Sequence, residues 1–393
     1  MNILFIEYDS QHFHQQVKLV DGGHNVWSTW SNKEYHTKFG IQSCDSGDWT
    51  TWTESSYQSL TNKITSLNID TVILGIPWLH WLRGVMPEGV TFLAATEDAF
   101  KLETDKFATR TAVGNLGLNV LDVVGQGKTD AFDLSGYSVR PVIVKPKNSF
   151  AGTHVIYENQ DAAAIAHFDD FTESQHYDYY LEKFLPNMKL EAEVHFIIAN
   201  DKWAIYYTGE MQNETDRRTF IKDKATSPWI SDVVLKKLSS DINTKVLAAA
   251  KTFLDWAVTK GGNYCGSINF GVDNSDELYW IECNARADAY NCLPCNVSGS
   301  DYLAALTTDP DKYVTDISQW TFTTVASTIN NSPIQEYPFN LHAEYEVDPP
   351  NCLLKQEDKY RTNHGGIVIY SQGDLPTEFV TKLTVDGKYK IVS

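Results

Sequence analysis

The segment CGSINFGVDNSDELYWIECNAR, residues Cys265–Arg286, decides the fold more than any other stretch of the chain. Two apolar runs, Ser267–Asp273 and Leu278–Asn284, flank a short polar turn, and this pattern predicts a β-hairpin. A tight turn between the runs fixes the pairing of the two strands, and this register places Asn269 directly opposite Glu282.

The second strand of this hairpin predicts a polar face. Glu282, Asn284 and Arg286 are each two residues apart, so their side chains project from the same face. Carboxylate and amide oxygens are the ligands that Mg²⁺ takes, usually together with nucleotide phosphates. A neighbouring arginine suits a phosphate or acyl-phosphate oxygen. The hairpin is therefore the first candidate for a functional site.

The first hundred residues predict a small α/β unit with a doubly wound parallel sheet. Short apolar runs at Asn2–Glu7, Asn25–Trp30 and Thr71–Gly75 are typical of strands buried on both faces. Such sheets bind ligands at the carboxyl ends of their strands, here Glu7–Ser10 and Gly75–Trp78. No G-x-G-x-x-G follows the first strand, which argues against a dinucleotide-binding oxidoreductase.

The rest of the chain alternates helices with strands and ends in a strand-rich tail from about residue 320. Thr96 followed by two acidic residues predicts the start of one helix that continues to Leu116. Further elements are expected at Pro141–Lys145, His154–Tyr157, Tyr179–Leu185 and Glu193–Ala199 (strands) and at Asp241–Lys260 (helix).

Composition narrows the partners. The chain has 393 residues and a formal net charge of −19, which argues against a nonspecific nucleic-acid or anionic-membrane binder. Six cysteines are too few for a disulfide framework in a chain of this length, so we expect a reducing, cytoplasmic location. The N-terminus lacks the basic region of a signal peptide, and no apolar run is long enough to span a bilayer.

Four short motifs resemble the ATP-grasp superfamily and occur in that family's order. They are DK at Asp105–Lys106, VIVKPKNSFAGTHV at Val142–Val155, LEKFL at Leu181–Leu185 and IECNAR at Ile281–Arg286. Within the superfamily, ECNARADAY is most similar to the motif of phosphoribosylamine–glycine ligase (glycinamide ribonucleotide synthetase). The resemblance implies an α/β ATP-grasp fold with an α+β lid. Its parts would be an N-terminal α/β domain (1–100), an ATP-grasp core (101–318) with a lid subdomain (about 118–185), and a β-rich C-terminal domain (319–393).

The resemblance also implies roles for individual residues. ATP would be held by Lys106, Lys145, Asn148, Ser149, Gly152, Thr153, Glu182, Lys183, Leu185 and Glu193. Metal ligands would be Glu282, Asn284 and Asn269. Arg286 would bind the acyl phosphate or the substrate carboxylate, and Lys145 would neutralise charge during phosphoryl transfer. Judged without the family, Lys106 is an ordinary exposed helical lysine, and Glu182 and Glu193 are ordinary strand glutamates.

The function implied is that of an ATP-dependent carboxylate–amine ligase that works through an acyl phosphate. Its cofactors would be ATP and Mg²⁺ (or Mn²⁺), and its partners a small carboxylate and a small amine, with the chain acting as a monomer or homodimer. The first alternative is a catalytically impaired nucleotide-binding protein, since Asn269 stands where relatives carry Asp or Glu. A second alternative, suggested by the high content of aromatic residues, is a noncatalytic carbohydrate-binding or scaffold module.

Two further features stay open. Arg217 and Arg218 either bind a phosphate of the substrate or are solvated charges. Cys292 and Cys295 form a single C-x-x-C with no second pair, so we interpret them as two cysteines of a loop rather than as zinc ligands.

Overall fold

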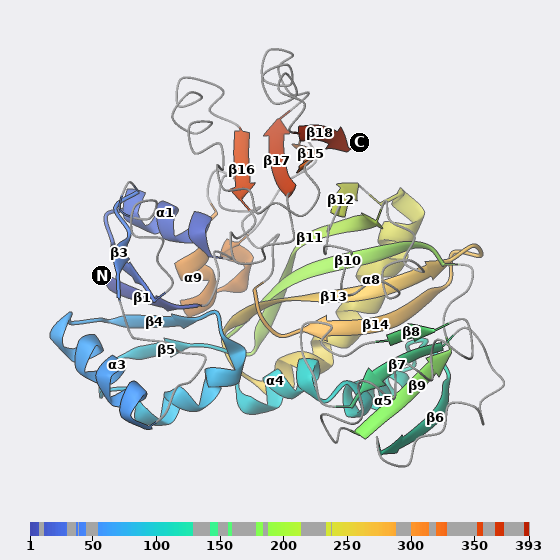
Figure 1. Ribbon diagram of the computed structural model, residues 1–393, viewed down its shortest axis with the longest axis horizontal. Helices are drawn as coiled ribbons and strands as arrows, with labels where there is room; N and C mark the ends of the chain where they lie inside the picture. Colours follow the sequence, from blue (N-terminus) through green and yellow to red (C-terminus); the bar gives the residue numbers. More distant parts are fainter. Residues whose placement is uncertain are drawn as a thin grey trace.

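The computed structural model describes residues 1–7, 12–29, 37, 39–44, 54–128, 142–147, 156–158, 178–183, 188–213, 233–236, 238–287, 300–313, 320–327, 352–356, 366–372 and 389–392. Its described strands form four sheets, of which three surround the candidate site (Figure 1).

The N-terminal sheet is parallel, as the apolar runs predict. Its order is β3-β2-β1-β4-β5, and every pairing within it is parallel. The strands are β1 (Asn2–Ile6), β2 (Asn25–Ser28), β3 (Gln42–Ser43), β4 (Thr71–Leu74) and β5 (Thr91–Leu93). The connecting helices are α1 (Phe13–Asp21), α3 (Glu54–Ser66) and the 3₁₀ segment η2 (Pro77–Val85).

Both faces of this sheet are buried, which explains why β1 is apolar at every position from Ile3 to Ile6. Leu4 and Ile6 belong to a core with residues of α3 and η2. Ile3 and Phe5 belong to a second core on the other face, which also contains Ile197 of the central sheet. The helices therefore cover both faces, and the second core joins the N-terminal sheet to the rest of the molecule.

The central sheet is antiparallel and has the order β12-β11-β10-β13-β14. Its strands are β10 (Met188–Ala199), β11 (Lys202–Asn213), β12 (Val233–Lys236), β13 (Tyr264–Asp273) and β14 (Leu278–Asn284). Helix α8 (Ser240–Ala257), extended by the 3₁₀ turn η5 (Val258–Lys260), packs on one face through Val246, Ala250 and Phe253. Gly261 follows η5, so the helical segment ends at Lys260 as expected.

The hairpin β13–β14 has the predicted register. Asn269 pairs with Glu282, and Ser267 pairs with Asn284. Beyond Asn269 the register shifts by one residue, because Phe270 pairs with Trp280. This irregularity lies next to Glu282, where a bulge changes the direction of side chains on the strand.

A third, smaller sheet has the order β6-β9-β7-β8 and is called the lid sheet here. Its strands are β6 (Val123–Lys128), β7 (Val142–Pro146), β8 (Ile156–Glu158) and β9 (Asp178–Lys183). It lies beside α5, the helix that leads into it (Figure 1). The backbone N–H of Lys106 donates to the carbonyl of Lys147 at 3.0 Å, and Phe107 contacts Tyr180 edge-on, with ring centroids 5.5 Å apart.

The single helix expected from Thr96 to Leu116 is wrong. The structure has α4 (Glu97–Thr104) and α5 (Lys106–Asn115), separated at Asp105. The Asp105 side chain accepts a hydrogen bond from the N–H of Ala108 at 3.0 Å and so acts as the N-cap of the second helix. This hydrogen bond stabilises a new helix start at Asp105 instead of one continuous helix. Lys106 is therefore the first residue of α5.

The C-terminal tail contributes a fourth sheet of order β16-β17-β15-β18. Its strands are β15 (Trp320–Ser327), β16 (Cys352–Gln356), β17 (Gly366–Gln372) and β18 (Tyr389–Val392), and they lie apart from the lid sheet (Figure 1). The short helix α9 (Tyr302–Thr307) and the turn η7 (Pro310–Lys312) come before this sheet. The domain boundaries stay a prediction. Within the described part of the chain, no helix is long and apolar enough to cross a membrane.

Candidate active site

Lys106 and Glu282 meet although they are far apart in the sequence. The Lys106 Nζ lies 3.1 Å from Glu282 Oε2. The lysine side chain is only 4% exposed, whereas the glutamate keeps 30% exposure. Lys106 is therefore not the exposed helical lysine that its local sequence suggests. Because Lys106 is the first residue of α5, its buried ammonium group contacts Glu282 of the hairpin.

Lys145 joins a second cluster of charges, in the lid sheet. Its Nζ lies 2.6 Å from Glu182 Oε2, and both side chains are buried. Lys145 pairs in register with Tyr180 on the neighbouring strand, so Glu182 is its diagonal neighbour on the same face. Glu182 also accepts a hydrogen bond from Arg110 Nε at 2.9 Å. One carboxylate thus holds a lysine of β7 and an arginine of α5.

The two clusters act on one another electrostatically. Burial by itself would raise the pKa of Glu282, but the positive charges of Lys106 and Lys145, the hydrogen bond from Lys106 and the charge of Arg286 together lower it. Glu282 therefore stays ionised at neutral pH. The lid sheet, α5 and the hairpin thus bring Lys106, Lys145 and Arg110 together with Glu182 and Glu282.

Arg286 is held by a residue that the sequence analysis missed. Its Nε donates to Glu103 Oε1 at 3.0 Å, and Glu103 Oε2 accepts from the N–H of Ala285 at 3.1 Å. Glu103 is fully buried in the last turn of α4. The carboxylate therefore fixes both the guanidinium and the backbone where the hairpin strand ends.

The expected metal ligands lie together on the hairpin. Asn269 and Glu282 are paired across the strands, and the Asn284 Nδ2 donates to Ser267 Oγ at 3.2 Å, which leaves its amide oxygen for another partner. The Asn269 Nδ2 donates to Glu191 Oε1 at 2.9 Å. Among the described residues no group of three or more His, Cys, Asp or Glu could hold a metal ion. One carboxylate with amide oxygens still fits Mg²⁺, which commonly uses one or two carboxylates plus phosphates.

Asp273, another carboxylate of the hairpin, has a structural role. Its Oδ1 accepts from the N–H groups of Ser275 and Glu277 at 2.8 and 2.9 Å, and so it closes the turn. It is the last residue of β13, whereas Asn269 lies in the middle of that strand.

Two other residues that the sequence analysis expects to hold ATP, Glu193 and Lys183, lie in the described part of the chain. Glu193 is buried on β10, where it pairs in register with Asn269 and lies 3.3 Å from His195 Nε2. Lys183 is exposed at the end of β9, and its backbone N–H donates to the carbonyl of Asp122. Other positions lie outside the described residues: Asn148, Ser149, Gly152, Thr153, Leu185, Arg217, Arg218, Cys292 and Cys295.

Sequence reasoning missed Arg110 and Glu103 for different reasons. Arg110 is four residues after Lys106, and that spacing puts both on one face of a helix, which was a usable signal. Glu103 had no such signal. A glutamate near the end of an amphipathic helix is ordinarily solvated, and only the packing of α4 on β14 buries it.

Solved structures of the same fold cover the whole chain. Biotin carboxylase from Campylobacter jejuni in a β-γ-ATP complex is 16% identical and covers 100% of this chain and 92% of its own, with a TM-score of 0.63. L-amino acid ligase from Bacillus licheniformis is 12% identical and covers 100% and 98%, with a TM-score of 0.66. N5-carboxyaminoimidazole synthetase from Staphylococcus aureus complexed with ADP is 12% identical and covers 98% and 96%, with a TM-score of 0.61.

These matches confirm the expected fold: the chain has the ATP-grasp fold. No family model matches the sequence, and neither does any curated protein. The specific likeness to phosphoribosylamine–glycine ligase stays a prediction from the motif at the end of the hairpin.

Proposed function

We propose that this protein is an ATP-dependent carboxylate–amine ligase that works through an acyl phosphate. The observation that carries the proposal is that Lys106 pairs with Glu282 of the hairpin and Lys145 pairs with Glu182 of the lid sheet, while the charge of Lys145 also acts on Glu282. The solved structures of the same fold include complexes with β-γ-ATP and with ADP, which supports a nucleotide in this space.

The charges suit phosphoryl transfer. Triphosphate brings several negative charges into one cleft, and the buried lysines could exchange their carboxylate partners for phosphate oxygens. Such a reaction needs positioning and charge neutralisation more than covalent help from the protein. Arg286, held by Glu103, would bind the carboxylate that accepts the phosphoryl group.

Mg²⁺ would be held by Glu282, Asn284 and Asn269, and it would supply charge neutralisation on the β- and γ-phosphates. Glu282 is the ionised member of this set, so it contributes the charge that the two amides lack. Lys106 Nζ contacts one of the Glu282 carboxylate oxygens.

The test is ATP turnover in the presence of candidate carboxylates. The purified protein is incubated with MgATP, hydroxylamine and single L-amino acids or short carboxylic acids, and ADP and hydroxamate are measured. We expect a wild-type signal that depends on one carboxylate class, and a loss of at least about 100-fold in Glu282→Ala, since the variant loses the charged ligand.

The matched control is Glu277→Ala, which removes an exposed carboxylate from the turn of the same hairpin. It should keep the wild-type rate. Equal rates in Glu282→Ala and wild type would show that the metal and phosphate assignment is wrong.

A second candidate is a nucleotide-binding protein that has lost catalysis. Asn269 favours it, because an amide in place of a carboxylate lowers the negative charge available to a second cation. This candidate predicts stabilisation by MgATP with no ADP from any carboxylate.

A further inference from the structure

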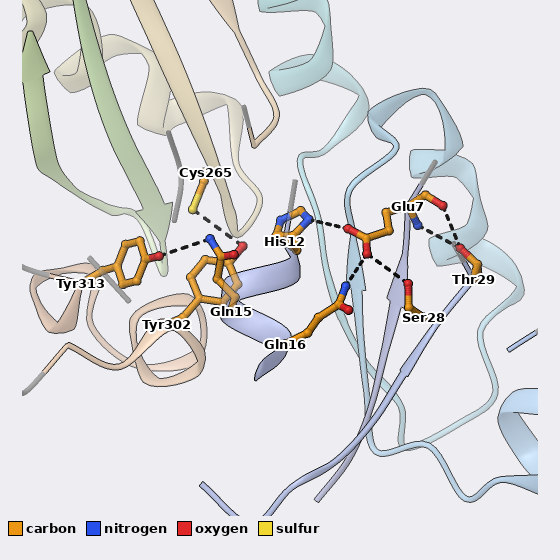
Figure 2. Close-up of polar contacts among 9 residues, drawn as sticks. All are labelled: Glu7, His12, Gln15, Gln16, Ser28, Thr29, Cys265, Tyr302 and Tyr313. Carbon is orange, nitrogen blue, oxygen red and sulfur yellow. Dashed lines mark hydrogen bonds and ion pairs between the residues drawn. The ribbon is translucent and has the colours of Figure 1, made fainter. Parts of the chain in front are cut away.

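A buried glutamate–histidine pair lies at the end of the first strand, outside the nucleotide site described above. The Glu7 side chain is 1% exposed. Its Oε1 accepts hydrogen bonds from Gln16 Nε2 and from Ser28 Oγ, the latter at 3.0 Å. Its Oε2 lies 3.2 Å from His12 Nδ1 (Figure 2). Three donors from two elements therefore surround one carboxylate.

The fold brings these residues together at the carboxyl ends of parallel strands. Glu7 follows β1, Ser28 ends β2, and His12 precedes α1 without capping it through its side chain. Gly75 follows β4, and a Cβ atom there would lie 3.1 Å from both Glu7 Cβ and the His12 ring. The neighbouring strand end thus has no side chain where the imidazole lies.

The hydrogen bond to Glu7 selects the tautomer of His12. A carboxylate only accepts hydrogen bonds, so the imidazole must donate from Nδ1. A neutral ring then carries its lone pair on Nε2. Among the described residues, Nδ1 is the ring nitrogen with a polar partner. The arrangement resembles the orientation of a catalytic imidazole by a buried acid, in which the acid fixes the base.

The other side of His12 lines a small hollow between the N-terminal sheet and the hairpin. The hollow is small, about 10 Å³, which is room for one water-sized group, and Arg286, Asn263 and Tyr302 also line it. The Tyr302 ring centroid lies 6.0 Å from that of His12, on the side away from Glu7 (Figure 2). An imidazole and the arginine of the proposed carboxylate site thus line one space, although His12 precedes α1 and Arg286 follows β14.

We propose that His12, oriented by Glu7, is the general base that deprotonates the amine nucleophile in this hollow. The inference rests on the proposed ligase function. The amine nitrogen attacks the acyl carbon, the C–N bond forms, and the C–O bond to phosphate breaks with its electron pair leaving on phosphate. The proton from nitrogen passes to His12 Nε2, and the Glu7 carboxylate balances the imidazolium charge until the proton is released to water.

The experiment separates the two half-reactions in His12→Asn. Asparagine retains a donor toward Glu7 but no base. The substrate is whichever carboxylate gives the most hydroxamate with the wild type. Hydroxamate formation with hydroxylamine, which is uncharged near neutral pH and needs no base, is compared with amide formation from pooled L-amino acids and ammonium chloride. We expect hydroxamate within about twofold of wild type and an amide rate lower by about 100-fold or more, the size of a general-base contribution.

Each other result overturns the proposal. Parallel loss of both products would show that His12 supports binding or folding, and no loss would show that it is not the base. A wild type that makes neither ADP nor hydroxamate would refute the ligase function itself, and the inference with it. Failure of the ligase is therefore distinguishable from failure of the base.

Two further variants test the role of Glu7 and provide a histidine control outside the cluster. Glu7→Gln keeps the shape of the acid and removes its charge, so it should lower the amide rate while sparing the hydroxamate rate. An unchanged amide rate in Glu7→Gln would refute the orienting role. His24→Asn changes the histidine that follows α1, outside this cluster, and should behave as wild type in both assays. Thermal melts of all three variants check that they are folded.

Discussion

Glu182 shows how one buried residue can hold two cations together. It is 2% exposed and contacts a lysine of β7 and an arginine of α5. Two buried cations against one carboxylate leave a net positive charge in a place of low polarity. If the proposed function is right, a phosphate group close to these two cations would gain favourable charge interactions.

Replacing Glu182 by alanine should destabilise the protein strongly, because Lys145 and Arg110 would lose a shared buried partner. Removal of one member of a buried ion pair typically costs about 3–5 kcal/mol. Urea unfolding followed by circular dichroism measures the loss. Lys183→Ala, at the exposed neighbouring position, should change the free energy of unfolding by less than about 0.5 kcal/mol. A Glu182→Ala variant as stable as the Lys183→Ala variant would contradict this account of the cluster.

At the scale of elements, the hairpin was predictable and the break between α4 and α5 was not. Alternation of apolar and polar residues around one turn was enough to pair Asn269 with Glu282. The break at Asp105 depends on a choice between capping and continuing a helix, and both are compatible with the local sequence. The same limit explains Glu103, whose burial depends on packing between elements far apart in the chain.

The ligand edge of the N-terminal sheet was also partly predictable. Apolar runs located the strand ends and thereby Glu7 and Gly75. They could not show that His12 turns back to Glu7, because the intervening chain has no periodic pattern. The adenosine-site roles stay predictions, since contacts in that region involve residues outside those described.

The junction between η5 and α4 depends on a glycine. Gly262 has a φ of +102°, and a Cβ atom there would lie 2.7 Å from the carbonyl oxygen of Ala94 and 2.8 Å from the backbone nitrogen of Thr96. Ala95 and Gly262 form an antiparallel bridge at this point. A side chain at this position would push the start of α4 away from the central sheet.

We therefore expect Gly262→Ala to cost more than a backbone penalty alone. The matched control is Gly117→Ala, which also has a positive φ of +84° but has nothing within 4 Å of the added Cβ. In the control, the free energy of unfolding should fall by about 1–2 kcal/mol, because alanine is strained in the left-handed conformation. The free energy of unfolding in urea should fall further in Gly262→Ala, and equal losses would rule out the steric argument.

At the scale of the whole molecule, two sheets share one core. Residues of β1 and β4 pack in the same cluster as Tyr206 and Tyr207 of β11 and Leu306 of α9. A ligand that bridges the hairpin and the lid sheet should therefore stabilise the molecule as a unit, because those parts are also tied to the N-terminal sheet.

A nonhydrolysable ATP analogue with Mg²⁺ should raise the melting temperature. A ligand at 100 times its Kd adds about 2.7 kcal/mol of stability, which corresponds to several degrees for a protein of this size. The measurement is a thermal melt with the analogue, with Mg²⁺ alone and with Mg²⁺ plus NADH. A shift with NADH instead would favour an oxidoreductase, and no shift with either nucleotide would favour a noncatalytic module.

Helix α1 has a mechanical consequence for any separation of the two sheets. Its adjacent residues Gln15 and Gln16 face opposite ways: Gln16 donates to Glu7, and Gln15 donates to the Tyr313 hydroxyl at 3.3 Å (Figure 2). The bond to Glu7 is charge-assisted and therefore the stronger of the two. If the N-terminal sheet and η7 were separated, the weaker bond to Tyr313 would break before the bond to Glu7, and His12 would stay with the N-terminal sheet.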